Sequence, residues 1–307
     1  METPDRRIVL VSRRTRLEDQ TARFNTVGQA RFHVEHLGAD FSDYEAEHGT
    51  YQQALRDAEA ILARFGRVHR LDRGFLPSYI FAPDCLVVVL GQDGLVANTL
   101  KYLTAAQPVI GVNPDPARWD GALASFSVAA LAQIAKAALA GLRPVSRVTM
   151  ARASLSDGQE LYAVNDLFIG PRSHVSARYE IRQGGRAEVQ SSSGLIVSTG
   201  LGATGWLRSL LAGAAGIAGR ALEMQGQDVS WDAPQLQFTV REPFPSRSTQ
   251  AGMVFGAITR DAPLLVVSQM AGYGVIFSDG IEADYLEFNA GVTATVEVAA
   301  RFGRLVR

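Results

Sequence analysis

The hydrophobic pattern of this chain changes its period near residue 143, and that change limits the folds open to it. Before it, short apolar runs alternate with segments of helical period. Residues 85–90 are apolar at every position, as in a parallel strand that is covered on both faces. Strands that alternate with helices in this way predict a parallel α/β sheet. Gly141, a residue type that suits the end of a helix, closes this part of the chain.

Beyond residue 143 the sequence predicts a β-rich domain of sandwich type. Short strand-like runs follow one another, with hairpin signals at Asp157-Gly158 and Gly184-Gly185. We therefore predict an α/β domain over residues 1–143 and a β-rich domain over residues 144–307. The extreme C-terminus of the second domain can pack against the first. The other predicted elements used below are helices at residues 44–65, 95–104, 122–140 and 203–222, and a strand at residues 160–169.

Composition excludes several classes of function. The chain has 307 residues, enough for two domains with cores of their own, and a formal net charge of −1. That charge gives no overall field to attract nucleic acid or an anionic membrane, so we expect neither partner, and any phosphate site must be local. The single cysteine, Cys85, excludes an internal disulfide and a multi-cysteine zinc site. It lies in the apolar run and is predicted to be a buried structural thiol.

The chain carries no pattern typical of membrane insertion. Residues 1–16 mix acids and bases around a short apolar stretch, which matches neither a signal peptide nor a spanning helix. No later segment stays apolar long enough to cross a bilayer. These observations together lead us to expect a cytoplasmic protein.

The first candidate site is the turn Gly91-Gln92-Asp93-Gly94, between the apolar run and a helix-like segment. Such a turn places backbone N–H groups and the positive end of a helix at one point, which suits phosphate. An acid there can accept a hydroxyl proton or hold a metal that bridges phosphates. The alternative is an ordinary turn capped by Asp93. No Gly-x-x-x-x-Gly-Lys-Ser/Thr sequence occurs, which excludes a P-loop mechanism.

The second candidate is the pair Asn165-Asp166 within an apolar strand pattern. Buried polar groups need hydrogen-bond partners, and a ligand can supply them. Asn165 suits a base edge or sugar hydroxyls, and Asp166 suits ribose hydroxyls or an amine. The alternative is a turn at the end of a strand, closed by a side-chain hydrogen bond to the backbone.

The third candidate is the small-residue turn at residues 198–206, where an apolar strand leads into a helix. Small residues let a ligand approach the backbone closely. Thr204 is placed to donate from the helix start, and Trp206 offers a stacking face. The alternative is a tight connection without a ligand. Two strand-to-helix turns of this kind, with a polar pair between them, favour a ligand cleft.

In this order, the three segments resemble the motifs of the NAD kinase family: a Gly-Gly-Asp-Gly turn, an Asn-Glu pair and a Thr-Pro-Thr-Gly-Ser-Thr-Ala-Tyr-like turn. The resemblance covers Leu86 to about Asn289. It implies the α/β fold shared by NAD kinases and diacylglycerol kinases, followed by a β-rich domain. The branch with mitochondrial-type members is the most similar, because of Val109-Ile110-Gly111-Val112-Asn113-Pro114-Asp115-Pro116, Arg241-Glu242-Pro243-Phe244, Ser278-Asp279-Gly280 and Glu287-Phe288-Asn289.

The resemblance implies a function and a set of roles. The chain would phosphorylate the 2′-hydroxyl of the adenosine ribose of NAD with ATP, as a homodimer or higher homo-oligomer. Magnesium would be held through the nucleotide phosphates and by no dedicated protein site. By position, Asp93 matches the catalytic acid that takes the hydroxyl proton; Asn165, Asp166, Thr204, Trp206 and Ser209 match residues that bind the acceptor; and Gly91, Gln92 and Gly94 would wrap the donor phosphates.

Three positions depart from the family pattern. Gln92 replaces a glycine, and if that position needs a positive φ, glutamine costs on the order of 1 kcal/mol. Leu95 replaces a threonine, and Ala203 replaces a serine. Two alternatives therefore stay open: a non-catalytic nucleotide-binding protein, and a lipid kinase of the diacylglycerol or sphingosine type. The pair Asn165-Asp166 favours a nucleotide acceptor over a lipid.

Overall fold

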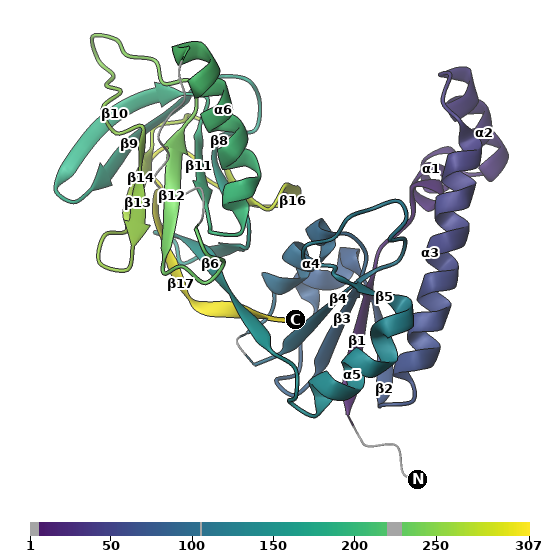
Figure 1. The fold of residues 1–307 in the computed structure, drawn as a ribbon. Helices are drawn as coiled ribbons and strands as arrows, with labels where there is room; N and C mark the ends of the chain where they lie inside the picture. Colours follow the sequence, from purple (N-terminus) through teal and green to yellow (C-terminus); the bar gives the residue numbers. More distant parts are fainter. Residues whose placement is uncertain (1–5, 105, 220–228) are drawn as a thin grey trace. The chain divides into compact units, whose positions relative to one another are not determined.

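The computed structural model describes residues 6–104, 106–219 and 229–307. The chain divides into two compact units, Met1–Val145 with Arg304–Arg307 and Ser146–Gly303, called here the first and second unit. Figure 1 shows each as a sheet structure with helices of its own. No helix among the described residues is long and apolar enough to span a bilayer.

The first unit is built on a parallel sheet with the strand order β2-β1-β3-β4, and the end of β17 pairs parallel with β4. All five residues of β3 are buried, as the predicted strand requires. Burial raises the pKa of the neighbouring Cys85 thiol to about 11. The elements are β1 (Arg7–Ser12), α1 (Arg16–Phe24), α2 (Val27–His36), α3 (Phe41–Leu62), β2 (Arg67–Asp72), η1 (Arg73–Ser78), β3 (Leu86–Leu90), α4 (Asp93–Leu100), β4 (Pro108–Asn113), β5 (Phe126–Ser127), η2 (Val128–Ala130) and α5 (Leu131–Leu139).

The strand order of the first unit contains a topological switch point. Because β1 lies between β2 and β3, the connection after β1 leads outward to β2, and the connection after β3 leads in the opposite direction to β4. Ligands of open α/β sheets bind at such a point, beyond the carboxyl ends of the strands. The segment after β1 and the turn Gly91–Gly94 after β3 lie at this edge.

The second unit is a sandwich of two mainly antiparallel sheets, and the predicted fold class is confirmed. One sheet contains β10-β9-β14-β17 with β6 and β7, and the other has the order β13-β12-β11-β8-β15-β16. Inward side chains of both, such as Tyr179 and Phe238, form one buried core. The elements are β6 (Val145–Leu155), β7 (Glu160–Ala163), β8 (Asp166–Pro171), β9 (Ala177–Gln183), β10 (Arg186–Ser192), β11 (Leu195–Ser198), η3 (Gly202–Thr204), α6 (Trp206–Ala218), β12 (Gln235–Val240), β13 (Phe255–Thr259), β14 (Leu264–Ser268), β15 (Gly274–Ser278), β16 (Ile281–Glu287) and β17 (Thr293–Val306).

Several predicted elements differ from the structure. The helix expected at residues 122–140 is only α5, because residues 122–124 form a loop and β5 with η2 precede the helix. The strand expected at residues 160–169 is broken into β7 and β8 by a bend. The helix expected at residues 203–222 begins as η3 and continues as α6, and its last three residues lie outside the described residues. Helices α1 and α2 were not predicted.

Candidate active site

The turn after β3 leaves little space for a side chain at Gly91 and does not need glycine at Gln92. A Cβ atom on Gly91 would lie 2.8 Å from Cδ2 of Leu95, whereas one on Gly94 would meet no atom within 4 Å. Gln92 has φ −85° and ψ 168°, an extended conformation open to any residue, and its side chain is exposed. The backbone cost considered for Gln92 is therefore absent, and this departure from the family pattern leaves the turn unstrained.

Asp93 is the first residue of α4, and its carboxylate fixes a distant loop. Oδ1 accepts hydrogen bonds from the N–H groups of Leu123 and Ala124, both at 2.9 Å, and Oδ2 accepts from that of Ala122 at 2.9 Å. Asp93 does not cap its own turn, since Gln92 is the N-cap residue and makes no side-chain cap. Three N–H donors hold the carboxylate in one position, and Oδ2, with a single donor, keeps capacity to accept another hydrogen bond.

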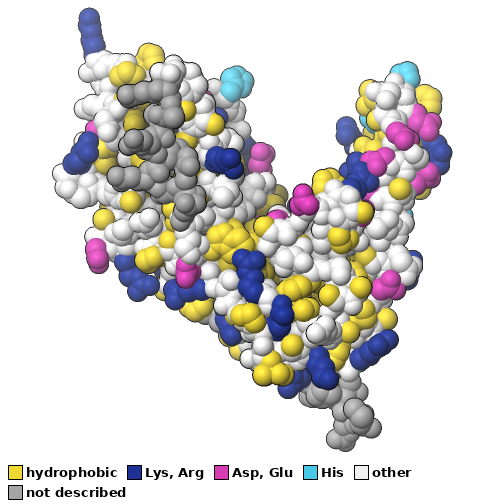
Figure 2. All heavy atoms as spheres, viewed as in Figure 1, with side chains coloured by type: hydrophobic (Ala, Val, Ile, Leu, Met, Phe, Trp, Pro, Cys, Tyr) yellow, Lys and Arg dark blue, Asp and Glu magenta, His cyan; other side chains and the backbone are white. Residues whose placement is uncertain are grey.

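A network of charges orders the segment after β1. Arg13 and Arg16 bind the two carboxylate oxygens of Glu47 at 2.8 and 2.9 Å. Arg16 and Arg118 bind Asp43 at 2.8 and 2.7 Å, and these hydrogen bonds, that of Arg118 first, lower the pKa of Asp43 to about 2. Figure 2 shows acidic and basic side chains interspersed over the part of the first unit formed by α1, α2 and α3. The sequence analysis missed this network, because its hydrogen-bonded partners are 27 to 75 residues apart in the chain.

Tyr51 joins the two strand ends that form the switch point. Its hydroxyl accepts from the backbone N–H of Arg13 at 2.9 Å and donates to the carbonyl of Leu90 at 3.1 Å. The ring is buried, and burial raises the pKa of the hydroxyl. Since Leu90 immediately precedes Gly91, the phosphate-binding turn proposed from the sequence is anchored to the segment after β1.

In the second unit, a carboxylate from a distant turn holds the bend that separates β7 from β8. Asp279 Oδ1 accepts from the N–H groups of Asn165 at 2.6 Å and Asp166 at 3.2 Å, and Oδ2 accepts from that of Val164 at 3.0 Å. The Asp279 N–H in turn donates to the Asp166 carbonyl at 2.9 Å. Asp279 has a positive φ of 54°, which Asp tolerates better than most residues. The sequence analysis named Asp279 only as part of a family-like motif, without a role.

The turn after β11 packs directly on this bend. The Thr199 N–H donates to the Asn165 carbonyl at 2.9 Å, and its hydroxyl donates to the Val164 carbonyl at 2.5 Å. A Cβ atom on Gly202 would lie 2.2 Å from the Asn165 carbonyl oxygen, so only glycine allows this approach. The Asn165 carboxamide makes no hydrogen bond with the described residues and is available to a ligand.

Asp166 has the most strongly shifted pKa among the predicted site residues. Burial raises it to about 7, the nearby Asp279 charge adds to the rise, and the hydrogen bond from the Ser198 hydroxyl opposes it. An Asp166 carboxyl that is partly protonated near neutral pH can donate or accept a hydrogen bond at a ligand.

This raised pKa predicts a stability change with pH. The folded state holds the Asp166 proton more tightly than the unfolded state, so the stabilisation is complete below about pH 4 and is lost as the pH rises through about 7. As the pH rises from about 4 to about 7, we expect the melting temperature of Asp166→Asn to increase relative to that of the wild type. A difference in melting temperature between the two proteins that stays constant over this pH range would contradict the raised pKa of Asp166.

The remaining predicted residues follow the same turn. Thr204 is exposed at the end of η3, and its hydroxyl donates weakly to the Leu201 carbonyl at 3.4 Å. Trp206 begins α6 and stacks on Phe168, with ring centroids 5.9 Å apart. Ser209 is exposed one helical turn later and bonds back to the Gly205 carbonyl.

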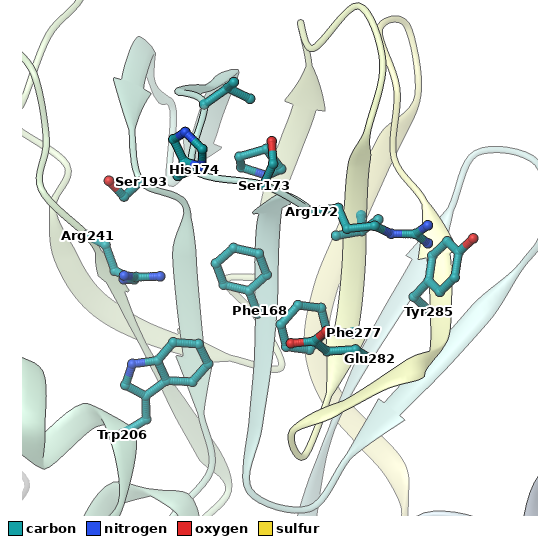
Figure 3. Close-up of a pocket in the computed structure, with 13 residues that line it drawn as sticks. Phe168, Arg172, Ser173, His174, Ser193, Trp206, Arg241, Phe277, Glu282 and Tyr285 are labelled. Carbon is teal, nitrogen blue, oxygen red and sulfur yellow. The ribbon is translucent and has the colours of Figure 1, made fainter. Parts of the chain in front are cut away.

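Trp206 and Phe168 line a cavity of about 410 Å³ in the second unit. Figure 3 shows Trp206 with Arg241 along one side, Phe168 and Phe277 in the middle, and Arg172 beside Tyr285 on the other side. The sequence analysis identified Trp206 as a site residue and named Arg241 only within a family-like motif. It missed Phe168, Phe277, Arg172 and Tyr285 as lining residues. Thus the structure brings the polar pair, the small-residue turn and Trp206 together in the second unit, and it places Gly91–Gly94 with Asp93 at the switch point of the first.

Comparisons with known proteins bear on the family resemblance and on the fold. No model of a known protein family matches the chain. A protein of Oryza sativa subsp. japonica described as a probable NADH kinase is 28% identical over 212 residues, which are 64% of this chain and 62% of the rice protein. The alignment thus covers less than two thirds of that relative.

Two solved structures resemble the whole chain. An NAD kinase from Archaeoglobus fulgidus in complex with ATP has a TM-score of 0.60 and 16% identity over 98% of this chain and 93% of its own. Yeast NADH kinase complexed with NADH has a TM-score of 0.58 and 14% identity over 99% of this chain and 84% of its own. These comparisons confirm the resemblance to NAD kinases inferred from the motifs, and the fold that it implies.

Proposed function

We propose that the chain is an NAD kinase, which transfers the terminal phosphoryl group of ATP to the 2′-hydroxyl of the adenosine ribose of NAD. The observation that carries the proposal is the immobilised Asp93 carboxylate beside an unstrained, open turn at the switch point of a parallel sheet. The names of the relatives support both substrates, because one solved structure holds ATP and another holds NADH. We further propose that the two compact units are the donor and acceptor domains.

In this mechanism, Asp93 accepts the hydroxyl proton through the free capacity of Oδ2. The fixed position of the Asp93 carboxylate favours the reaction, because catalysis of phosphoryl transfer depends mainly on the positioning of the reacting groups and on charge stabilisation. The backbone of Gly91, Gln92 and Gly94 would approach the donor phosphates, and Asn165, Asp166 and Thr204 would bind the adenosine. Among the described residues no three acidic, histidine or cysteine side chains are grouped to hold an ion. Mg²⁺ commonly binds through substrate phosphates, where it neutralises charge.

A coupled assay for NADP formation from NAD and ATP tests the proposal directly. Parallel reactions with NADH as acceptor and with polyphosphate as donor identify the preferred pair. Turnover of NAD without turnover of diacylglycerol or sphingosine would exclude the lipid kinase alternative. Binding of NAD without any turnover would instead support the non-catalytic alternative and contradict the proposal. Size-exclusion chromatography would test the proposed homodimer or higher homo-oligomer, and cell fractionation the proposed cytoplasmic location.

Gln92→Gly tests how the turn contacts the donor. The wild-type backbone is unstrained at this position, so glycine relieves nothing and removes an exposed amide that can donate to a phosphate. We expect the KM for ATP to rise about 2- to 10-fold, the value of one hydrogen bond, with kcat nearly unchanged. Steady-state kinetics at varied ATP measures both. A wild-type protein that is inactive and becomes active with glycine would show instead that Gln92 blocks the site.

A further inference from the structure

The peptide group between Ala122 and Leu123 has a second partner besides Asp93. Its N–H, which belongs to Leu123, donates to Oδ1 of Asp93 at 2.9 Å. Its carbonyl, which belongs to Ala122, accepts from the guanidinium of Arg307 at 3.3 Å. The peptide bond is trans, so its N–H and carbonyl point in opposite directions. The cation and the carboxylate therefore lie on opposite sides of one peptide group.

The strand pairing of β17 brings Arg307 to this loop. The end of β17 lies in the first unit and pairs parallel with β4, with Leu305 opposite Val109 (Figure 1). The same register, continued by two residues, places Arg307 level with Gly111. A Cβ atom on Gly111 would lie 2.1 Å from the Leu123 carbonyl oxygen, so the loop passes directly over β4 at this level. The contact of Arg307 thus follows from the sheet that carries both segments.

A cation at the carbonyl strengthens the donor at the other end of the same peptide group. Arg307 draws electron density toward the Ala122 carbonyl, and this polarisation makes the Leu123 N–H a stronger donor to Asp93. Hydrogen bonds that involve a charged group are shorter and stronger than neutral ones, and here both ends of the chain of hydrogen bonds are charged. A guanidinium keeps its charge at every pH at which proteins are folded. Arg307 is therefore a permanent support for the orientation of the carboxylate.

The loop before this peptide group is held by contacts that do not involve Arg307. Asn113, the last residue of β4, donates to the Trp119 carbonyl at 2.7 Å. Arg118 binds Asp43 at 2.7 Å. Loss of the Arg307 guanidinium should therefore leave the loop folded and loosen only the peptide group that faces the carboxylate.

We propose that Arg307 is a positioning residue for Asp93, which orients the carboxylate through the Ala122–Leu123 peptide group without touching either substrate. The inference rests on the proposed function, in which Asp93 accepts the proton of the 2′-hydroxyl. Displacement of a reacting group by about 1 Å can slow an enzyme about 10²-fold, even when the changed residue lies away from the chemistry. A less firmly held carboxylate should slow the transfer step and leave the binding of both substrates as it is.

Steady-state kinetics of Arg307→Gln at varied NAD and ATP tests the positioning role. We expect kcat to fall about 3- to 10-fold, the value of one hydrogen bond, with the KM values for both substrates nearly unchanged. Arg307→Lys keeps a positive donor and should recover most of the lost rate. A raised KM for ATP with an unchanged kcat would overturn the inference, because Arg307 would then bind the donor.

Arg304→Gln is the matched control. Arg304 lies three residues earlier on β17, and its guanidinium donates to the Ala106 carbonyl at 3.0 Å, away from the loop that contacts Asp93. This variant loses a similar hydrogen bond at the same strand end and should keep the wild-type kcat. An equal loss of kcat in both arginine variants would assign the effect to the packing of β17 and overturn the inference.

A double-mutant cycle with Asp93→Asn tests whether Arg307 acts through the carboxylate. Residues that act through one another have non-additive effects, so Arg307→Gln should reduce the residual rate of Asp93→Asn by less than twofold. A further loss as large as that in the wild-type background would contradict the proposed route through Asp93.

Amide hydrogen exchange, measured by NMR, tests the contact without any turnover. Arg307→Gln should speed the exchange of the Leu123 N–H about 3- to 10-fold, and Arg304→Gln should leave it unchanged. Unchanged exchange at Leu123 in Arg307→Gln would overturn the inference, whatever the kinetics. If NADP is formed and Arg307→Gln keeps the wild-type kcat, the positioning role is wrong and the kinase proposal stands. If no NADP is formed but exchange is faster as expected, the kinase proposal is wrong and Arg307 still orients Asp93.

Discussion

Asp93→Asn should lower the rate of phosphoryl transfer to NAD by about 10²- to 10⁴-fold, the usual value of a general base. The change also has a structural cost. In the wild type, both carboxylate oxygens accept backbone N–H groups of residues 122–124, and an asparagine NH₂ group in place of one oxygen would face a donor with another donor. We expect about 1–3 kcal/mol of lost stability in addition to the lost rate. Single-turnover kinetics and a melting curve measure the two effects separately.

Gly121→Ala separates the role of the loop from that of the carboxylate. A Cβ atom on Gly121 would lie 2.4 Å from the Ala124 carbonyl oxygen, so the substitution disturbs the loop and keeps Asp93 intact. If Asp93 is the base, Gly121→Ala should lower stability to a similar degree but reduce the rate far less. Equal loss of rate in the two variants would mean that Asp93 acts only by holding the loop.

The sequence predicted the strand-turn-helix around Asp93 because its signals are local. An apolar run, glycines and a helix start are adjacent in the chain, and each constrains the backbone by itself. The partners of Asp93 could not be predicted in the same way. They are 29 to 31 residues away, in a stretch whose alanines favour a helix in isolation. Tertiary hydrogen bonds to Asp93 override that propensity and delay the start of the helix until α5.

The polar pair Asn165-Asp166 was located by its contrast with apolar neighbours, but its conformation was not. The sequence pattern predicted one continuous strand at residues 160–169. In the structure this strand is broken by a bend, and three consecutive N–H groups point toward Asp279. More than a hundred residues separate the two segments. Ser278-Asp279-Gly280 could have indicated a turn, since Asp and Gly both tolerate positive φ, but nothing in the pattern names its partner.

Each unit therefore uses the same kind of contact in its own candidate site segment. A carboxylate accepts three backbone N–H groups from a remote segment, Asp93 in the first unit and Asp279 in the second. Charged acceptors make stronger hydrogen bonds than neutral ones, and a triple contact fixes a loop without a packed core. The site residues lie on irregular segments that depend on these two carboxylates more than on strand propensity.

Asp279→Ala should lower the stability of the second unit and weaken acceptor binding at the same time. Loss of the carboxylate leaves the N–H groups of Val164, Asn165 and Asp166 without this acceptor, which should cost about 2–4 kcal/mol and lower the melting temperature by about 5–10 °C. Because Asn165 and Asp166 then lose their fixed positions, we expect the Kd for NAD to rise at least about tenfold. Melting curves and calorimetry with NAD measure the two effects.

Asp279→Gly distinguishes the carboxylate from the backbone conformation. Glycine adopts the observed φ of 54° freely, whereas alanine there costs on the order of 1 kcal/mol, so the alanine variant should be the less stable of the two. The comparison of glycine with wild type then reports the loss of the carboxylate without the backbone strain of alanine. A glycine variant that melts with the wild type would show that Asp279 contributes only its conformation. If either variant is less stable but binds NAD with unchanged affinity, the bend at residues 164–166 is not part of the acceptor site. The hydrogen bonds to Asp279 would then stabilise the fold without positioning the ligand.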